Sequence, residues 1–230
     1  MRTQNPALHL YEEIMLLALR DDKGTLLTYV AEFAIAGALL AELMLDGRIA
    51  ITDAKKQHIG TRDASPTGDP ILDEALARIE KRKRPASVVS WLGQLAGAKW
   101  LRHRAAGQLC RRGILRADEK TVLLFFKQKL YPELDPMPER KLLERMRAAV
   151  TSESGPVDPR TAVLISLAHG THLLPAALGK DVVKRRRHRI ESIVRGEATG
   201  RAAKAAIEAH QAAMIAMMVV PGVIAATSGK

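Results

Sequence analysis

The sequence Tyr29-Val-Ala-Glu-Phe-Ala-Ile-Ala-Gly-Ala-Leu-Leu-Ala-Glu-Leu-Met-Leu45 is apolar on every side of a helix except at Glu32 and Glu42. A helix of this kind is either a membrane span or the centre of a soluble core. The two carboxylates argue against a span, because an acidic side chain near the middle of a bilayer costs about 2.5–3.5 kcal/mol. We therefore predict a buried central helix. It should end at Asp46-Gly47, because glycine is the usual residue after a helix C-terminus.

The composition of the whole chain indicates a helical, cationic protein. The 230 residues are enough for one sizeable core, and only 3% of them are aromatic. The formal net charge of +11 predicts an anionic partner, which is nucleic acid, a membrane surface or an acidic protein. The single cysteine, Cys110, excludes a disulfide framework and is typical of a reduced, cytosolic setting. We find no signal peptide or lipidation motif, so we expect any contact with a membrane to be peripheral.

Helical periodicity and turn residues place the other elements. Further helices are predicted over residues 8–20, 70–80, 86–96, 98–112, 138–150, 159–170, 172–178 and 198–219. One hairpin is predicted from residues 48–52 and 57–60, and a second from residues 114–116 and 121–126 around Asp118-Glu119. The prediction is a mainly α, helical globular domain around the buried apolar central helix, with small β-hairpins. It should cover residues 1–230 as a single domain, with residues 1–7 and 222–230 as flexible ends.

The sequence contains none of the common catalytic or phosphate-binding motifs, such as G-x-G-x-x-G, G-x-x-x-x-G-K-[ST], H-E-x-x-H or G-x-S-x-G. His169 and His172 are three residues apart, but two histidines without a third ligand are a weak metal signal. Glu12 and Glu13 are adjacent, so on a helix they face apart and do not form a catalytic pair. Neighbouring arginines could lower the pKa of Cys110, but no base accompanies it. We expect a non-catalytic protein with no metal and no cofactor.

Binding through positive charge remains, and three clusters of basic residues compete for that role: 81–84, 99–112 and 184–189. The simplest interpretation of the first is a solvated linker. The second shares a helix with Leu101, Ala105, Leu109 and Cys110, which should face the core and hold the charges on a defined surface. A helix followed by Arg-Arg-Gly and a hairpin also resembles the end of a winged helix. Nucleic-acid binding by residues 99–126 is therefore an alternative, although few aromatic residues are available there for base stacking. A structural adaptor whose charge serves solubility is a third.

A family resemblance sharpens this choice. Residues 63–76, Asp63-Ala-Ser-Pro-Thr-Gly-Asp-Pro-Ile-Leu-Asp-Glu-Ala-Leu76, closely resemble the S-D-A-P-T-G-D-x-x-L-D-E-A-L segment of the Golgi phosphoprotein 3 family. Other segments resemble family motifs in the same order: Leu10–Gly24, Leu39–Ile49, Ser90–Leu92 and Val163–His169. The resemblance runs from about residue 8 to 220. The chain is shorter than the eukaryotic members, lacks their acidic N-terminus and looks like a bacterial-type member.

The resemblance implies a peripheral membrane protein that binds anionic phospholipid, with phosphatidylinositol 4-phosphate as the family's headgroup. The family pocket uses a Trp and an Arg near the central helix and two basic residues on a later helix. The latter two correspond to Lys99 and Arg102, and Arg104 matches another family arginine. The Trp position falls at or near Leu27 and the Arg position on Ala36, so two of the four pocket residues are replaced.

Two further surfaces are predicted. Leu26 and Leu27, in the loop before the central helix, and Tyr29, at its start, are expected to insert into the membrane; packing of the two leucines into the core is the alternative. The family hairpin used for oligomer contact carries Phe125, Phe126 and Tyr131 here; packing inside the monomer is the alternative for these aromatic residues. Cytoplasmic tails of membrane enzymes are a further candidate partner, because eukaryotic members of the family bind the tails of membrane glycosyltransferases.

Overall fold

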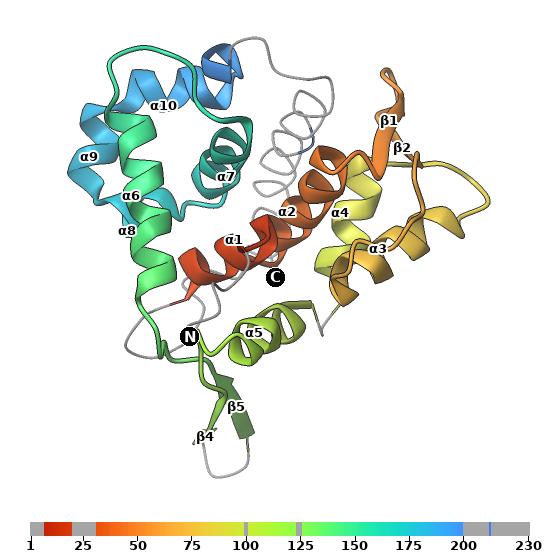
Figure 1. Ribbon diagram of the computed structural model, residues 1–230, viewed down its shortest axis with the longest axis horizontal. Coiled ribbons are helices and arrows are strands. Elements are labelled where there is room, and N and C mark those ends of the chain that lie inside the picture. Colours follow the sequence, from red (N-terminus) through yellow and green to blue (C-terminus); the bar gives the residue numbers. More distant parts are fainter. Residues whose placement is uncertain (1–6, 20–30, 99–100, 123–125, 200–211, 213–230) are drawn as a thin grey trace, which may run out of the picture.

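The computed structural model describes residues 7–19, 31–98, 101–122, 126–199 and 212. The chain is mainly α, as predicted (Figure 1). Its helices are α1 (Leu10–Ala18), α2 (Ala31–Leu45), α3 (Pro70–Glu80), α4 (Val88–Ala96), α5 (Leu101–Arg111), α6 (Met137–Thr151), α7 (Pro159–Gly170), α8 (Leu174–Leu178), α9 (Lys180–Arg185) and α10 (Arg187–Val194). The strands are β1 (Ile49–Asp53), β2 (His58–Thr61), β3 (Ala86–Ser87), β4 (Asp118–Val122) and β5 (Phe126–Leu130), and a 3-10 turn covers Glu197–Thr199.

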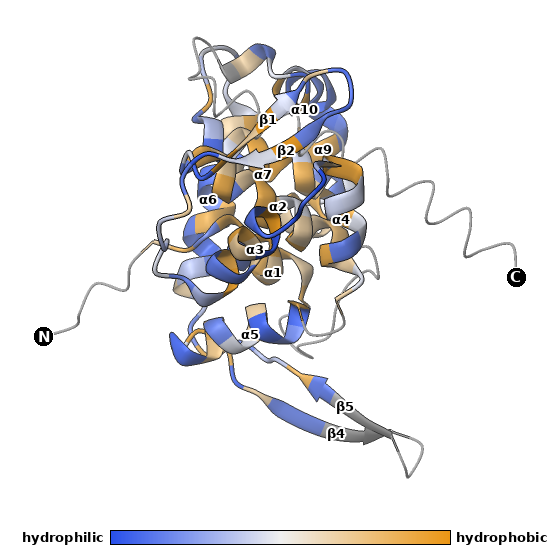
Figure 2. Ribbon diagram, turned by 90° about the vertical axis from the view of Figure 1, so that its right-hand side faces the viewer, coloured by the Kyte–Doolittle hydropathy of each residue, from blue (hydrophilic) through white to orange (hydrophobic). Residues whose placement is uncertain are grey.

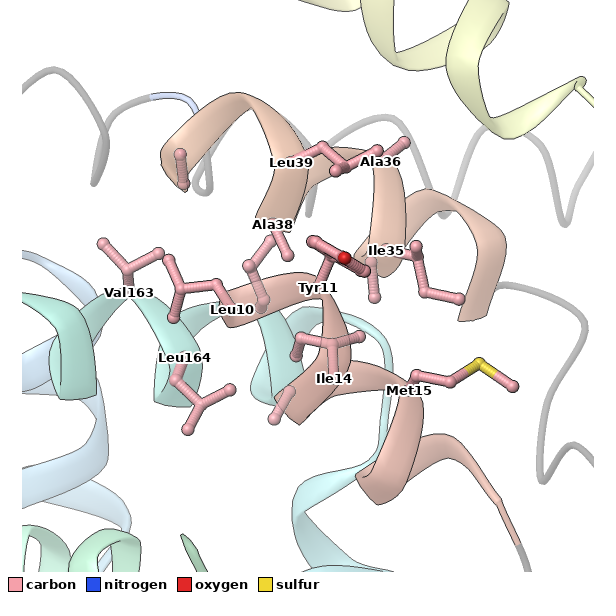
Figure 3. Packing of buried hydrophobic residues seen from close by; sticks show 14 of the residues in the cluster. Leu10, Tyr11, Ile14, Met15, Ile35, Ala36, Ala38, Leu39, Val163 and Leu164 are labelled. Carbon is pink, nitrogen blue, oxygen red and sulfur yellow. The ribbon is translucent and has the colours of Figure 1, made fainter. Parts of the chain in front are cut away.

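The apolar helix α2 is the centre of the fold, which confirms the prediction over residues 31–45. Twelve of its fifteen residues are buried, and it contacts α1, α3, α4, α5 and α7. Figure 3 shows Leu10 and Ile14 of α1 packed near Ala38 and Ile35 of α2. Burying one such aliphatic side chain contributes about 1.5–3 kcal/mol. The first two residues of the predicted helix, Tyr29 and Val30, lie outside the described residues.

The hairpin of β1 and β2 also forms as predicted. Ile51 pairs with Ile59, and the short strand β3 adds to β2 through Ile59 and Ala86. This small sheet lies beside the C-terminal end of α2, next to α3 and α4 (Figure 1). The predicted helices around residues 70–80, 86–96, 138–150 and 159–170 correspond to α3, α4, α6 and α7.

The second predicted hairpin exists, but its predicted strands were wrong. The strands are β4 and β5, in which Asp118 pairs with Leu130 and Val122 with Phe126, so Asp118 and Glu119 belong to a strand rather than to the turn. The two strands project from the helices beside α5 (Figure 2). A projecting ribbon has no face buried against a core, so hydrophobic alternation does not mark its register.

Two further predictions concern the C-terminal helix and membrane spans. The predicted helix over residues 198–219 lies almost wholly outside the described residues. None of the helices within the described ranges is long and apolar enough to cross a bilayer.

Candidate functional site

The orientation of α5 depends on one buried carboxylate in the loop before α3. Asp69 is 3% exposed and caps α3 by accepting the backbone N–H groups of Ile71 at 2.9 Å and Leu72 at 3.0 Å. Its other oxygen accepts the Tyr11 hydroxyl at 2.7 Å and the Gln108 side-chain amide at 2.9 Å. Burial alone would raise the pKa of Asp69, but these hydrogen bonds outweigh it and lower the pKa. A single carboxylate therefore joins α1, α3 and α5.

The apolar side of α5 faces inward as predicted, since Leu101, Ala105 and Leu109 are buried. Cys110, also predicted to face the core, is only partly buried. Two arginines of α5 and one just after it pair with carboxylates on three other helices. Arg102 Nη1 lies 3.1 Å from Glu32 Oε1 in the first turn of α2. Arg104 pairs with Glu74 of α3 and donates to the Pro70 carbonyl at 3.2 Å. Arg112, just after α5, has its Nε 2.9 Å from Glu12 Oε1 of α1.

Exposure separates the structural arginine from the two that an external anion can reach. Arg112 is 15% exposed and Glu12 is 0% exposed, so breaking this pair would leave a buried charge at a cost of about 3–5 kcal/mol. The side chains of Arg102 and Arg104 are 42% and 35% exposed. Exposed ion pairs are worth about 0–1 kcal/mol, so an anion competes readily for these two arginines.

Arg102 and Arg104 do not converge on one pocket. They are two residues apart on a helix, so they leave it on different sides. Arg102 lies toward the start of α2, whereas Arg104 lies against α3. Lys99, the predicted partner of Arg102, lies outside the described residues, and so do Leu26, Leu27, Tyr29 and Phe125. Ala36, at the position of the family arginine, is fully buried within α2.

Comparison with known proteins identifies the family of this chain. The family model described as Golgi phosphoprotein 3 (GPP34) matches residues 10–210, which include α1 to α10. The chain belongs to the Golgi phosphoprotein 3 family. Vacuolar protein sorting-associated protein 74 of Eremothecium gossypii is 30% identical to it over 220 residues. That match covers 80% of this chain and 66% of the relative, so the chain spans just under two thirds of the relative's length.

In this member of the Golgi phosphoprotein 3 family, Tyr131 is part of the monomer core. It is 7% exposed, and its hydroxyl lies 2.8 Å from His103 Nδ1. Burial, together with Arg102 and Lys129, lowers the pKa of His103, so the imidazole is neutral at pH 7. Its Nε2 accepts from Arg102 Nε at 3.3 Å, which leaves Nδ1–H as the donor to Tyr131. The burial of Tyr131 therefore agrees with the alternative prediction, in which this residue packs inside the monomer. Phe126 belongs to β5, but the structure does not describe its side chain.

A cluster of buried charges around Glu42 was missed in the sequence. Glu42 is 3% exposed, and it accepts hydrogen bonds from Arg160 Nη1 at 2.7 Å and Nη2 at 3.0 Å. The Leu10 backbone N–H also donates to it, and His9 Nδ1 lies 3.4 Å away. Burial alone would raise the pKa of Glu42, but the hydrogen bonds from His9 and Arg160 lower it. The available signal was an acid inside an otherwise apolar helix, because such a group requires a partner.

The two adjacent carboxylates of α1 face apart, as predicted. Glu12 pairs with Arg112 of the α5 end, and Glu13 pairs with Arg145 of α6 at 2.9 Å. Burial raises the pKa of both carboxyl groups, although the paired arginines oppose it. Through these ion pairs, Glu12 holds α1 to the end of α5 and Glu13 holds it to α6, so both acids have a structural role.

The remaining chemical candidates are weak. Within the described ranges, no group of three or more His, Cys, Asp and Glu residues gathers as metal ligands would. His169 at the end of α7 and His172 in the following turn are both exposed. Burial raises the pKa of the Cys110 thiol more than Arg111 lowers it, so the suggestion that nearby arginines activate this thiol was wrong.

Proposed function

We propose that this member of the Golgi phosphoprotein 3 family is a non-catalytic, cytoplasmic, peripherally associated membrane protein that binds anionic phospholipid through α5. Lys99 and Arg102 would contact the headgroup, with Arg104 nearby. The observation that supports this best is the state of Arg102: its side chain is 42% exposed and holds one carboxylate at 3.1 Å. A lipid phosphate is also negatively charged and can accept two N–H groups of a guanidinium at once. The net charge of +11 adds long-range attraction to an anionic surface.

The proposed affinity combines charge and insertion. Each basic residue near an anionic surface contributes about 1 kcal/mol, and each inserted apolar side chain adds roughly 1.5–3 kcal/mol at most. Leu26, Leu27 and Tyr29 would supply the inserted side chains. Phosphatidylinositol 4-phosphate is the headgroup that the family resemblance suggests. Because Ala36 is buried, that position gives a headgroup no contact, and we propose anionic phospholipid as the general ligand.

Protein partners belong to the same proposal. The name of the Eremothecium gossypii relative refers to vacuolar protein sorting, which fits an adaptor that holds tails of membrane enzymes. The projecting β4–β5 ribbon (Figure 2) supports a contact between copies of the chain, to which Phe125 and Phe126 would contribute. Analytical ultracentrifugation of the wild type and of a Phe125→Ser/Phe126→Ser variant tests this contact. A monomer at all concentrations would exclude it.

Co-sedimentation with vesicles tests the lipid proposal. The protein should pellet with vesicles that contain anionic phospholipid and stay in solution with neutral vesicles. Arg102→Glu should weaken this binding more than Lys55→Glu, the same charge reversal at an exposed residue of the β1–β2 turn. Equal pelleting with both kinds of vesicle, or with neither, would contradict lipid binding. An Arg102→Glu variant that binds as the wild type does would place the contact elsewhere.

Nucleic-acid binding is retained as the second candidate because α5 lies beside a projecting β-ribbon (Figure 2) whose sequence includes Lys120, Lys127 and Lys129. Phosphate contacts would make such binding fall steeply with salt. A gel-shift experiment at two salt concentrations tests it. A shift that vanishes at the higher salt while vesicles fail to bind would favour this candidate over the lipid proposal.

A further inference from the structure

A second cationic hollow lies outside the α5 site, between the C-terminal end of α3 and α4. Its volume is about 450 Å³. It is lined by Arg78, Lys81, Arg82, Trp91, Gln94 and Leu95. Three of these six residues are basic and none is acidic, which is unusual for a surface on which ion pairs balance the charge. The hollow therefore has the lining expected for an anion.

The guanidinium of Arg82 is held in place at this hollow. Its central carbon lies 5.2 Å from the centroid of the Trp91 ring, within the range of a cation–π contact. Arg82 Nη1 donates to Gln94 Oε1 at 2.9 Å, and Arg82 Nε donates to the Arg84 carbonyl at 3.1 Å. A guanidinium has five N–H donors, so three remain for a ligand. The solvated-linker interpretation of residues 81–84 does not account for this fixed arrangement.

Trp91 adds a buried donor that has no acceptor within the described part of the chain. Its side chain belongs to the core at 3% exposure, and its Nε1 has no hydrogen-bond partner among the residues that the structure describes. The same ring lines a smaller hollow of about 210 Å³ on the β2 side, where Thr61 Oγ1 also lacks a partner within the described ranges. An unsatisfied buried donor costs about 1–3 kcal/mol. An acceptor oxygen entering beside the ring would remove that cost.

Two acids lie near the cluster: Glu80 lines the smaller hollow together with Arg82, and Glu74 lies on α3. Glu74 pairs with Arg78 at 2.8 Å and also with Arg104, so one carboxylate serves two guanidinium groups. Lys81 is exposed at the C-terminal cap of α3. The helix dipole favours cations there, which explains Arg78 and Lys81 without a ligand. It does not explain the stacking of Arg82 on Trp91, or why the Trp91 N–H finds no acceptor among the residues described.

We propose that this hollow is a second anion-binding site, distinct from the α5 face, and that it takes a phosphate group with Arg82 as its principal ligand. Lys81 adds a second positive charge at the rim. A phosphate group suits the site because it accepts several hydrogen bonds at once from a fixed guanidinium. A phospholipid headgroup and a soluble phosphate share this chemistry.

Tryptophan fluorescence tests the proposal in the full-length chain. The substitution Trp100→Phe leaves Trp91 as the single tryptophan. Inorganic phosphate, neutral vesicles and vesicles containing phosphatidic acid are each titrated in this background. Phosphate should change the Trp91 emission, because an anion that engages Arg82 alters the cation over the ring. Arg82→Gln should weaken phosphate binding about tenfold or more, as expected for loss of a charge-assisted contact. The exposed Lys55 on the β1–β2 turn provides a matched control, and Lys55→Gln should bind as before.

The outcomes separate the ligand source and the two sites. A response to inorganic phosphate shows that a soluble phosphate suffices. A response to phosphatidic-acid vesicles alone, lost in Arg82→Gln, assigns the site to a lipid headgroup. Arg102→Gln should leave the phosphate response intact, so failure of the α5 proposal would not affect it. No response to either probe, or an Arg82→Gln variant that responds as its parent does, overturns the proposal. Thermal unfolding of each variant verifies that the fold is retained.

Discussion

Glu32 restrains Arg102, so neutralising Glu32 should strengthen binding to anionic vesicles. The substitution Glu32→Gln keeps the size of the side chain and removes the charge that lies 3.1 Å from Arg102 Nη1. The guanidinium is then available to a lipid phosphate without first leaving a carboxylate. Arg102→Gln is the reciprocal change and should weaken the same binding.

The size of the effect follows from exposure and charge. The side chains of Arg102 and Glu32 are 42% and 21% exposed, so the pair contributes at most about 1 kcal/mol, which the wild type gives up on binding lipid. Removing a negative charge beside an anionic surface adds about another 1 kcal/mol. The total of about 1–2 kcal/mol corresponds to roughly five- to thirtyfold tighter binding.

Vesicle co-sedimentation over a range of lipid concentrations measures this gain. Glu153→Gln is the matched control, because Glu153 is exposed in the loop after α6 and changes the net charge equally. The gain should shrink at high salt, since exposed charges are screened there. If Glu32→Gln binds no better than Glu153→Gln, the contact does not run through Arg102. An Arg102→Gln variant with wild-type binding would lead to the same conclusion.

Three other predictions concern the buried charges. Arg160→Met leaves Glu42 buried without its counter-charge and should lower the free energy of unfolding by about 3–5 kcal/mol in urea denaturation, whereas adding Glu42→Leu should recover much of the loss. The pKa of His9 is raised from 6.5, mainly by its hydrogen bond to Glu42, so its contribution to stability is present below pH 6.5 and is lost as pH rises through the raised pKa; His9→Gln should remove this dependence from unfolding curves measured across that range. Asp69→Ala removes a helix cap and two side-chain hydrogen bonds and should cost about 2–4 kcal/mol in thermal denaturation, whereas Asp69→Asn should cost less.

The sequence was sufficient for the core because α2 permits few interpretations. A fifteen-residue helix whose only polar side chains are two carboxylates is most stable at the centre of a core, because the carboxylates disfavour a membrane span. The β1–β2 hairpin was predictable for a related reason, since its apolar residues pack beside that centre. The strands β4 and β5 read Asp-Glu-Lys-Thr-Val and Phe-Lys-Gln-Lys-Leu. Their polar sequences carry little record of which residues pair, so the charged pair Asp118-Glu119 was mistaken for a turn.

The candidate sites were less predictable because their partners are distant in the chain. The position of Arg102 on α5 followed from spacing, but its pairing with Glu32, 70 residues away, required the fold. The same holds for Arg82, whose contacts with Trp91 and Gln94 convert an apparent linker into a fixed group. Helical periodicity reports which face is buried, but it does not report which acid each exposed arginine meets.

The large sequence separation between the partners of the buried ion pairs affects how the chain folds during synthesis. Glu13 and Glu42 emerge early in synthesis, yet Arg145 lies 132 residues after Glu13 and Arg160 lies 118 residues after Glu42. Non-local contacts of this kind slow folding. Until they form, the apolar helices are exposed, so the chain is prone to aggregate and is bound by chaperones. A nascent chain that stalls before Arg145 would contain the apolar helices α1 and α2 but neither arginine that pairs with Glu13 and Glu42, and cellular quality control should remove it.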